Sequence, residues 1–436
     1  MPLPDRPADR PPLKQVWHYT LETITPLHIG AGGTPLQKDT DFIVTSRDVA
    51  VLDAERTFER IYERSLRPTA APAVAAPVAP SNSIAQQLAK LGLGSDVADA
   101  LDEPAGPSER DVLDRLARGM TPNEAVEAGW LIAADLSGPA SIVRYRLQPP
   151  SGVGAPLPDL QPPQILPLIK NARQQPYLPG SSLKGALRTA LAAQLFSAAD
   201  QPLQLNDVLG RGYANPKAAD DRIESRLLGR DPNHDLLRAL LVGDSAALPT
   251  SPALAVAGTY TIRNDGSLQF KPGFYVALEV FPPGTQLQGQ IRLDRYLFAP
   301  EPQKQLGFGP TADWLADFPA LCNAHARRLI SSETAFYRQH GLPQVAGFYE
   351  RLLHRLDGLP PGACLLQLSW GTGWLAKTLG PLLTAQPAFA AVRAQFGAGM
   401  NRRPTAVFPK TRRLTLGGPN YAQAGEPLGW VELRLV

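Results

Sequence analysis

The stretch that most constrains the fold is YLPGSSLKGALRTALAAQL, residues 177–195, in which a turn sequence runs directly into a helix pattern. Its apolar residues recur three and four positions apart, which is the period of one helix face. They are Leu183, Leu187, Ala190, Leu191 and Leu195. Ser181 and Ser182 are of a type preferred at helix N-caps and stand just before this stripe. The pattern therefore predicts a helix that starts at these serines and buries one face.

Two cations in this helix are poorly placed for helix stability. Lys184 lies in the first turn, where the positive end of the helix dipole repels it. Lys184 and Arg188 are four residues apart, and such a like-charge pair costs about 0.2–0.5 kcal/mol. Both residues are explained if an anion, most simply a phosphate, binds at the helix N-terminus. The simpler interpretation is a solvated basic helix face behind an ordinary serine cap. Lys184 precedes Gly185, so the spacing does not fit a Walker A nucleotide loop.

Length and composition limit the class of protein. With 436 residues the chain is long enough for two or three domains, and 44% hydrophobic and 19% charged residues are typical of a globular protein. We expect residues 1–15, which are rich in proline and charge, to be a disordered leader without a secretory signal. Two cysteines, Cys322 and Cys364, are too few for a disulfide framework, so we expect a reducing cytoplasm. The net charge of +3 is weak evidence for a polyanion partner.

The patterns along the chain indicate two consecutive α+β units, at residues 16–199 and 200–436. In the first unit we expect a strand at 16–25, a hairpin at 41–53, a helix at 55–66, and a strand at 141–148 that carries Arg144 and Arg146 on one face. Residues 68–138, a proline-alanine linker followed by three helical segments, are expected to be an insertion. In the second unit we expect three strands within 254–294, helices at 311–329 and 345–356, and closing strands after residues 408 and 427.

Three glycine-rich turns, each followed by a basic residue, recur along the chain. The first contains Gly30, Gly32 and Gly33 with His28 and Lys38, the second is the turn at 177–185, and the third contains Gly371 and Gly373 with Lys377 and Thr378. Lys410, Arg412 and Arg413 add a basic segment near the C-terminus. Glycine allows close approach of the backbone to a ligand, so the repetition favours an anionic ligand more than one turn alone would.

These residues resemble the RAMP superfamily of CRISPR proteins. The resemblance rests on the order of PLHIGAGG with a downstream Asp41, YLPGSSLKGALRTAL, LLVGDS, ALEVFPPGTQLQGQIRLD, WGTGWLAKT and FPKTRRL. Within the superfamily the sequence looks most like the fifth Csm subunit of type III-A effector complexes, because of the tryptophan-glycine turn and the FPKTR segment. PGSSLKGALRT is the most specific piece, and residues 1–15 and 68–138 are not covered.

The resemblance implies two ferredoxin-like, RRM-related units that bind guide RNA by shape and backbone. Subunits of this kind cap the 3′ end of the crRNA filament, contact the neighbouring Csm backbone subunit and the small subunit, support guide maturation and antiviral defence, and are regarded as non-catalytic. Target RNA is a further candidate partner, whereas no cofactor, metal or membrane is expected. The residues expected at RNA are His28, Gly30, Gly32, Gly33, Lys38, Ser181, Ser182, Lys184, Arg188, Gly371, Gly373, Lys377, Thr378, Lys410 and Arg412.

Physical chemistry supports a phosphate-binding site, called the phosphate grip below, independently of the resemblance. Backbone N–H groups, hydroxyls and flanking cations contact phosphates and position a strand without reading its sequence. The sequence has no RNP-like pattern of sheet aromatics that would stack bases as in an RRM. Strand arginines such as Arg144, Arg146, Arg412 and Arg413 are better placed for contacts with the RNA backbone or with an acidic partner.

Two other classes of function stay open. A metal-assisted ribonuclease would use Asp41 with Asp39 or Asp244, but capping a turn or pairing with Lys38 explains Asp41 more simply. His28 could be a general base, although packing or hydrogen bonding under the loop suits a lone histidine better, and Asp244 fits a turn with Ser245. A different backbone or capping subunit of a type III complex is also compatible. A nucleotide-dependent metabolic enzyme is disfavoured because Walker and Rossmann spacings are missing.

Overall fold

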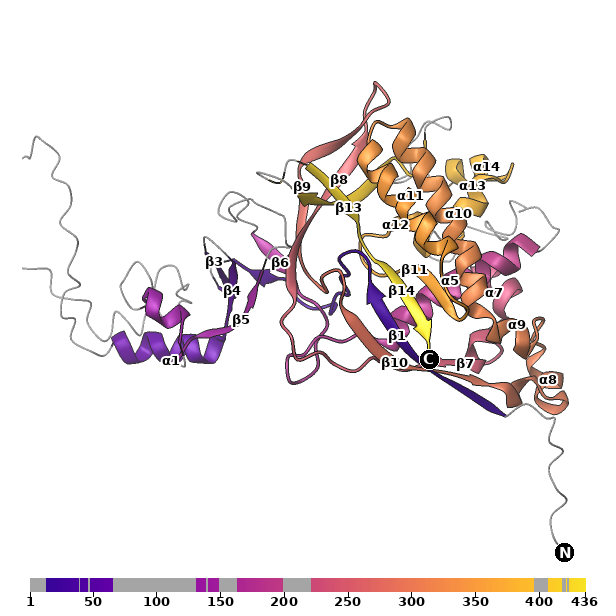
Figure 1. Cartoon of the computed structure of the whole chain (residues 1–436), viewed down its shortest axis with the longest axis horizontal. Coiled ribbons are helices and arrows are strands. Elements are labelled where there is room, and N and C mark those ends of the chain that lie inside the picture. The colour runs from indigo at the N-terminus through magenta and orange to yellow at the C-terminus, as the bar shows by residue number, and fades with distance from the viewer. Residues whose placement is uncertain are drawn as a thin grey trace, which may run out of the picture. The chain divides into compact units, whose positions relative to one another are not determined.

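The computed structural model describes residues 13–38, 40–45, 48–65, 131–138, 140–148, 163–198, 221–395, 407–417, 421 and 423–436. The chain forms two compact units, a larger one from residues 1–35 and 147–436 and a smaller one from residues 36–146 (Figure 1). This division differs from the expected boundary at residue 199, because the N-terminal strand belongs with the C-terminal half. The fold is α+β, with β-sheets and helices in both units. Among the helices of the described ranges, none is long and apolar enough to cross a membrane.

A five-stranded antiparallel sheet forms one part of the larger unit. Its order is β11 (Ala363–Gln367), β14 (Trp430–Leu435), β1 (Lys14–Thr23), β10 (Gln286–Asp294) and β7 (Leu240–Val242). Alternation of apolar and polar residues predicted β1, and the alternating burial of its side chains confirms it. Because β1 pairs with β10 and β14, the first strand of the chain completes a sheet whose other members follow residue 239.

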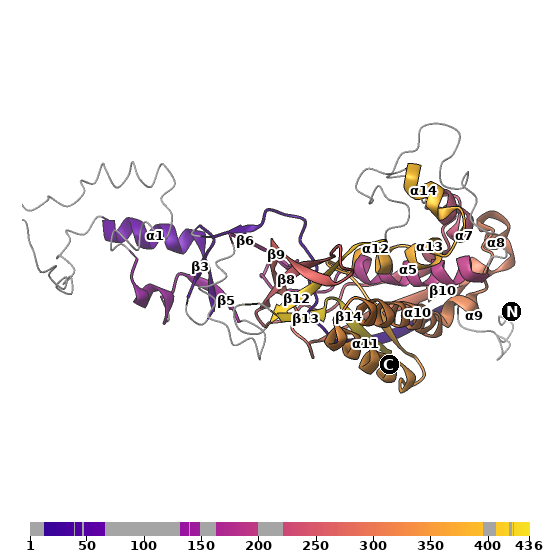
Figure 2. The same cartoon turned by 90° about the horizontal axis from the view of Figure 1, so that it is seen from above.

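Helices cover the apolar face of this sheet. The predicted helix is α5 (Gly180–Ala198), and its stripe of Leu183, Leu187 and Leu191 is fully buried. It packs against α10 (Phe318–Gln339), which in turn packs against α11 (Pro343–Asp357), as Figures 1 and 2 show. The leucines of α5 join Tyr19 and Leu21 of β1 in one hydrophobic core. Burying a leucine side chain contributes about 1.5–3 kcal/mol, so this stripe fixes the position of α5.

A second sheet in the larger unit contains the long hairpin of β8 (Ala253–Ile262) and β9 (Leu268–Val280). In the larger unit its order is β13 (Gln423–Pro427), β12 (Thr411–Gly417), β8, β9 and β6 (Gln164–Leu166). Strand β9 begins earlier than the sequence pattern indicated, because it continues through Pro272 and Gly273, which break the apolar alternation. The register shift between Gly258 and Tyr260 accommodates this irregularity.

Shorter elements complete the larger unit. They are α7 (Asp221–Leu228), η5 (Leu236–Ala239), η6 (Arg295–Phe298), α8 (Pro300–Leu306), α9 (Ala312–Ala316), α12 (Gly373–Lys377), α13 (Gly380–Thr384) and α14 (Phe389–Gln395). Cys322 on α10 and Cys364 on β11 are buried free thiols.

The smaller unit has a three-stranded sheet of β3 (Phe42–Val44), β4 (Val49–Leu52) and β5 (Val143–Leu147), with α1 (Ala54–Ser65), β2 (Leu36–Gln37) and η2 (Ala133–Leu136). The expected hairpin is confirmed by antiparallel pairing of β3 with β4. The strand arginines contact carboxylates of the same chain, Arg144 with Asp53 at 3.6 Å and Arg146 with Asp48 at 3.0 Å. The three helical segments expected within 68–138 lie outside the described residues.

The first residue of α5, Gly180, lies very close to the backbone that follows β7. A Cβ atom on Gly180 would lie 2.2 Å from the carbonyl oxygen of Val242. Only glycine therefore fits between α5 and the loop that follows β7. Gly185, one turn further along the same helix, has no atom within 4 Å of a Cβ position.

We expect Gly180→Ala to lower the free energy of unfolding by about 1–3 kcal/mol, because the new methyl group must displace backbone. Gly185→Ala is the matched control and should raise it by about 0.5–1 kcal/mol, because alanine is the better helix former and has open space there. Urea denaturation followed by circular dichroism measures both changes. Equal effects of the two substitutions would contradict the close approach.

Candidate nucleic-acid interface

The N-terminus of α5 is capped by an anion that the chain itself provides. The Asp244 carboxylate accepts a hydrogen bond from the backbone N–H of Gly180 at 2.8 Å. Beside it the Ser245 hydroxyl accepts one from the N–H of Leu178 at 2.9 Å. The anion expected at this helix N-terminus is therefore the Asp244 carboxylate, whose negative charge is also stabilised by the helix dipole. Asp244 thus caps α5, which differs from the turn with Ser245 that the sequence suggested.

The serines of this stretch lie within the helix. Since α5 begins at Gly180, Ser181 and Ser182 occupy its first turn, with Ser181 exposed and Ser182 half-buried. The prediction that they precede the helix as N-caps is therefore wrong. A residue 64 positions away performs the capping.

Arg188 is neutralised by two carboxylates. Its guanidinium donates to Glu224 at 2.8 Å and to Asp235 at 2.5 Å. Burial alone would lower the pKa of Arg188, but the hydrogen bonds and charges of these two carboxylates outweigh it and raise the pKa. The like-charge pair with Lys184 is therefore compensated inside the protein, and the guanidinium of Arg188 is already occupied.

Lys184 has no such ion-pair partner among the described residues. Its side chain is half-buried, and no ion pair joins it to a carboxylate within the described ranges. Burial lowers the pKa of Lys184 and the nearby Arg188 charge adds to this, whereas Asp235 opposes it. Lys184 is thus the cation of this stretch that can accept an external anion.

The first glycine loop rests on a buried histidine. His28 is 1% exposed, and its Nδ1 lies 2.7 Å from the carbonyl oxygen of Glu279. Burial lowers the pKa of His28, which favours the neutral imidazole. This confirms hydrogen bonding under the loop and places the imidazole away from the surface, so its predicted contact with RNA is replaced by a supporting role.

The backbone of this loop is what faces outward. Gly30, Gly32 and Gly33 are exposed. Gly32 has a φ of 69°, a conformation that favours glycine. Lys38 follows in the smaller unit.

The third glycine turn adjoins the first. The backbone N–H of Trp370 donates to the carbonyl oxygen of His28 at 3.2 Å, and the Ser369 hydroxyl donates to the same oxygen. Gly371 and Gly373 have φ values of 86° and 74°, which the turn requires. This contact joins segments from opposite ends of the chain.

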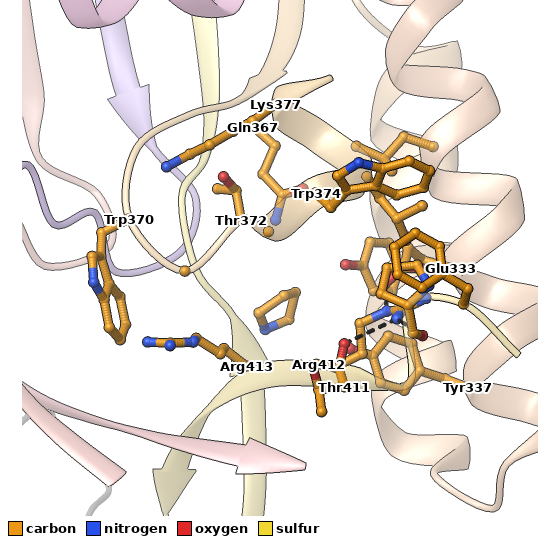
Figure 3. Close-up of a pocket in the computed structure, with 18 residues that line it drawn as sticks. Glu333, Tyr337, Gln367, Trp370, Thr372, Trp374, Lys377, Thr411, Arg412 and Arg413 are labelled. Atoms are coloured by element: carbon orange, nitrogen blue, oxygen red, sulfur yellow. Dashed lines mark hydrogen bonds and ion pairs between the residues drawn. The ribbon is translucent and has the colours of Figure 1, made fainter. Parts of the chain in front are cut away.

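Two cations lie beside the third turn. Lys377, at the end of α12, is exposed at the surface. Neighbouring protein atoms still shield part of its side chain from water, and this desolvation, together with the charge of Arg413, lowers the pKa of Lys377. The Arg413 guanidinium lies over the Trp370 ring, 4.4 Å from its centroid, as Figure 3 shows. Neither cation forms an ion pair with a carboxylate of the described residues. Lys410 is exposed nearby in sequence.

Two predicted site residues instead have structural contacts. Arg412 makes two hydrogen bonds of 2.8 Å to the Glu333 carboxylate and lies over the Phe336 ring, so it faces the interior and its predicted contact with RNA is corrected to this ion pair. The Thr378 hydroxyl donates to the carbonyl oxygen of Trp374 at 2.7 Å and accepts from the N–H of Gly380. Strand alternation explains the error for Arg412, because neighbouring residues point to opposite faces and only Arg413 points outward.

The structure thus gathers the three glycine turns in the larger unit. The third turn donates hydrogen bonds to the carbonyl oxygen of His28 in the first turn. Helix α12, which follows the third turn, packs against α5, which follows the second turn (Figure 2). Trp370, Trp374, Lys377 and Arg413 line a pocket of about 500 Å³ at the third turn (Figure 3). Trp374 was not singled out from the sequence, and the repeated tryptophan in WGTGW was the signal available for it.

Asp41 has a structural contact in the smaller unit. Its carboxylate accepts a hydrogen bond from the N–H of Gln37 at 2.7 Å, which confirms that it caps a turn. Asp39 lies outside the described residues. Within the described part of the chain, no group of three or more His, Cys, Asp or Glu residues could hold a metal ion.

These features define an α+β protein whose glycine-rich turns lie in one unit with cations that have no carboxylate partner among the described residues. The RAMP superfamily model matches residues 20–375, and the chain belongs to this superfamily. Among curated proteins it is similar to two proteins named CRISPR system Cms protein Csm5, from Mycobacterium tuberculosis strains CDC 1551 / Oshkosh and ATCC 25618 / H37Rv. Each is 30% identical over 139 residues, 30% of this chain and 36% of the relative, so the match spans little more than a third of the relatives' length.

Two solved structures share the fold over nearly the whole chain. One is a chain of a Csm–crRNA–target RNA ternary complex from a type III-A CRISPR-Cas system, with a TM-score of 0.61 and 22% identity, covering 96% of this chain and 100% of that one. The other is Csm5 of T. onnurineus, with a TM-score of 0.55 and 21% identity, covering 94% and 99%. The chain therefore resembles the fifth Csm subunit, as its motifs predicted.

We expect Glu333→Gln to lower the free energy of unfolding by about 3 kcal/mol, because it leaves the buried Arg412 charge without its counter-ion. The control is Asp357→Asn, which removes the exposed partner of Arg327 and should change it by less than about 1 kcal/mol. Chemical denaturation measures both. A Glu333→Gln protein of unchanged stability would mean that Arg412 is free to leave the interior.

Proposed function

We propose that the chain is a non-catalytic subunit of a type III-A Csm complex that binds guide RNA and caps the 3′ end of the crRNA filament. The observation that carries the proposal is the convergence of three glycine turns beside Lys184, Lys377 and Arg413, none of which is paired with a carboxylate of the described residues. Exposed backbone and unpaired cations are what phosphate recognition needs, and such contacts position a strand without reading its bases.

The fold supports an RRM-related description of one of the two proposed ferredoxin-like units, although its elements come from both sides of the expected boundary at residue 199. In chain order β1, α5, β7, β10, α10 and β14 follow the β-α-β-β-α-β plan, and the sheet order β14-β1-β10-β7 is that of a ferredoxin-like fold, with β11 added at the edge. The hairpin of β8 and β9 with β12 and β13 belongs to the proposed second unit. Two ferredoxin-like units interleaved in this way explain why the compact units do not meet at residue 199.

The proposed partners follow from the relatives. A structural neighbour is a chain of a Csm complex with crRNA and target RNA, which supports both RNAs and other Csm proteins as partners. The Csm backbone subunit and the small subunit are proposed as partners from the resemblance of the motifs. In such a complex this chain would support guide maturation and antiviral defence. Arg188 and Arg412 support the site from within. The residues that remain proposed RNA contacts are Gly30, Gly32, Gly33, Lys38, Ser181, Ser182, Lys184, Gly371, Gly373, Lys377 and Lys410.

The absence of catalysis is part of the proposal. The Asp41 carboxylate is engaged by the Gln37 N–H, and its role as a cap explains its position without chemistry. A metal-dependent ribonuclease acting through Asp41 is the alternative from a different class. Another backbone or capping subunit of a type III complex would share the same RNA contacts, and subunit order in the assembled complex distinguishes it.

We expect Lys184→Gln and Lys377→Gln each to weaken binding of single-stranded RNA by about two- to tenfold, because each loses one phosphate contact. Each should also reduce the slope of log K against log salt concentration by about 0.7. Fluorescence anisotropy over a salt series measures both quantities.

Two control variants accompany this measurement. Lys304→Gln removes the same charge from an exposed lysine that is paired with Glu301, and should leave affinity unchanged. Arg188→Gln should reduce stability more than affinity, because its guanidinium contacts carboxylates. Unchanged RNA affinity in both Lys184→Gln and Lys377→Gln would refute the phosphate grip.

The wild-type protein should not cleave labelled precursor RNA in the presence of Mg²⁺ or Mn²⁺, and Asp41→Ala should behave identically. Gel electrophoresis of the RNA over time provides the measurement. Metal-dependent cleavage that disappears in Asp41→Ala would establish the ribonuclease alternative.

A further inference from the structure

The pocket at the third glycine turn has aromatic walls that the phosphate grip does not use. Trp370 lies on one side and Trp374 on another, as Figure 3 shows. Phe408 lines the same pocket and makes an edge contact with Trp374, with ring centroids 4.7 Å apart. Its volume of about 500 Å³ is within the range of about 300–1,000 Å³ that is typical of small-molecule sites. The pocket lies entirely within the larger unit.

The charges around this pocket do not balance. Arg412 and Glu333 line it and neutralise each other through two hydrogen bonds. Lys377 and Arg413 also line it, and neither is paired with a carboxylate of the described ranges. Two like charges beside an aromatic hollow repel each other, and a bound anion would relieve that repulsion.

The polar groups of the pocket are largely committed to the protein itself. The Gln367 amide donates to the carbonyl oxygen of Leu428 at 2.9 Å. The Thr372 hydroxyl donates to the carbonyl oxygen of Ser369, also at 2.9 Å. A ligand here is therefore held by ring faces and by charge more than by hydrogen bonds to its edges.

From this combination we propose that the pocket receives one unstacked nucleotide of an RNA strand, with its base against the tryptophan rings and its phosphate at Lys377 and Arg413. The inference rests on the proposed function and deepens it, because the glycine turns position the strand and the pocket accepts a single base from it. An aromatic ring and a cation together match a base and its phosphate, and every base has a ring face that can stack. We therefore expect little discrimination among the four bases.

Photo-crosslinking of the full-length protein tests the position of the base. Single-stranded RNAs that carry 4-thiouridine at the 3′ end, the 5′ end or an internal position are irradiated with the protein, and crosslinked peptides are identified by mass spectrometry. We expect crosslinks at Trp370, Trp374 or Phe408. Crosslinks confined to peptides outside the pocket would overturn the proposal even if RNA binds tightly, which would leave the proposed function intact.

Affinity measurements provide a second test. Trp370→Ala should weaken RNA binding about fivefold or more, and Trp370→Phe should weaken it less because a stacking surface remains. The control is Tyr296→Ala, which removes an aromatic side chain that is 52% exposed and does not line the pocket, and should leave affinity unchanged. Equal affinities of Trp370→Ala and the control would refute the stacking role.

Competition with free nucleotides separates the two sources of a base and phosphate. AMP, GMP, CMP and UMP are each added to the complex of protein and RNA. Displacement of the RNA only at concentrations far above that of the oligonucleotide supports an RNA-bound nucleotide. Displacement at comparable concentrations would assign the pocket to a free mononucleotide and overturn the proposal, and a protein that binds no RNA at all would overturn the proposed function as well.

Discussion

Strand β1 pairs with β10 over nearly its whole length and with β14 over its last five residues. This double pairing places β1 in the middle of a sheet whose other strands come from the C-terminal half of the chain. The glycine loop that follows β1 then contacts the turn at Trp370. Within this contact the carbonyl oxygen of His28 accepts hydrogen bonds from the Trp370 N–H and the Ser369 hydroxyl. The candidate interface therefore depends on a long-range sheet contact, which explains why neither half of the chain could form it alone.

Local pattern predicted the elements well. The alternation of apolar and polar residues in VWHYTLETIT predicted β1, and the leucine stripe predicted α5. Both predictions succeed because the side chains of a strand repeat every two residues and those of a helix every 3.6, so the residues that share a face can be read from their spacing. The division into units could not be predicted in this way, because strand pairing between residues 14 and 435 leaves no local signal. Pro272 and Gly273 likewise concealed the length of β9, which tolerates them beside a register shift.

For the site, the sequence predicted the turns but not their partners. Lys184 and Arg188 looked alike as helix cations, yet Arg188 is neutralised by Glu224 and Asp235, from 36 and 47 residues away. The anion expected at the N-terminus of α5 is Asp244, again distant in sequence. Charge pattern can identify an electrostatic problem within a helix, but only the tertiary structure decides whether the protein or a ligand resolves it.

The basic residues fall into two groups, those that are neutralised by carboxylates of the protein and those that have no such carboxylate among the described residues. Arg188 and Arg412 each contact carboxylates, and moving them to an RNA phosphate would leave the half-buried Asp235 and the buried Glu333 without their counter-ions. Lys184, Lys377 and Arg413 have no such carboxylate within the described residues, so binding of a phosphate by these cations would break no ion pair of the described chain. The proposed RNA binding at this surface therefore does not require rearrangement of the ion pairs that Arg188 and Arg412 form on α5 and β12.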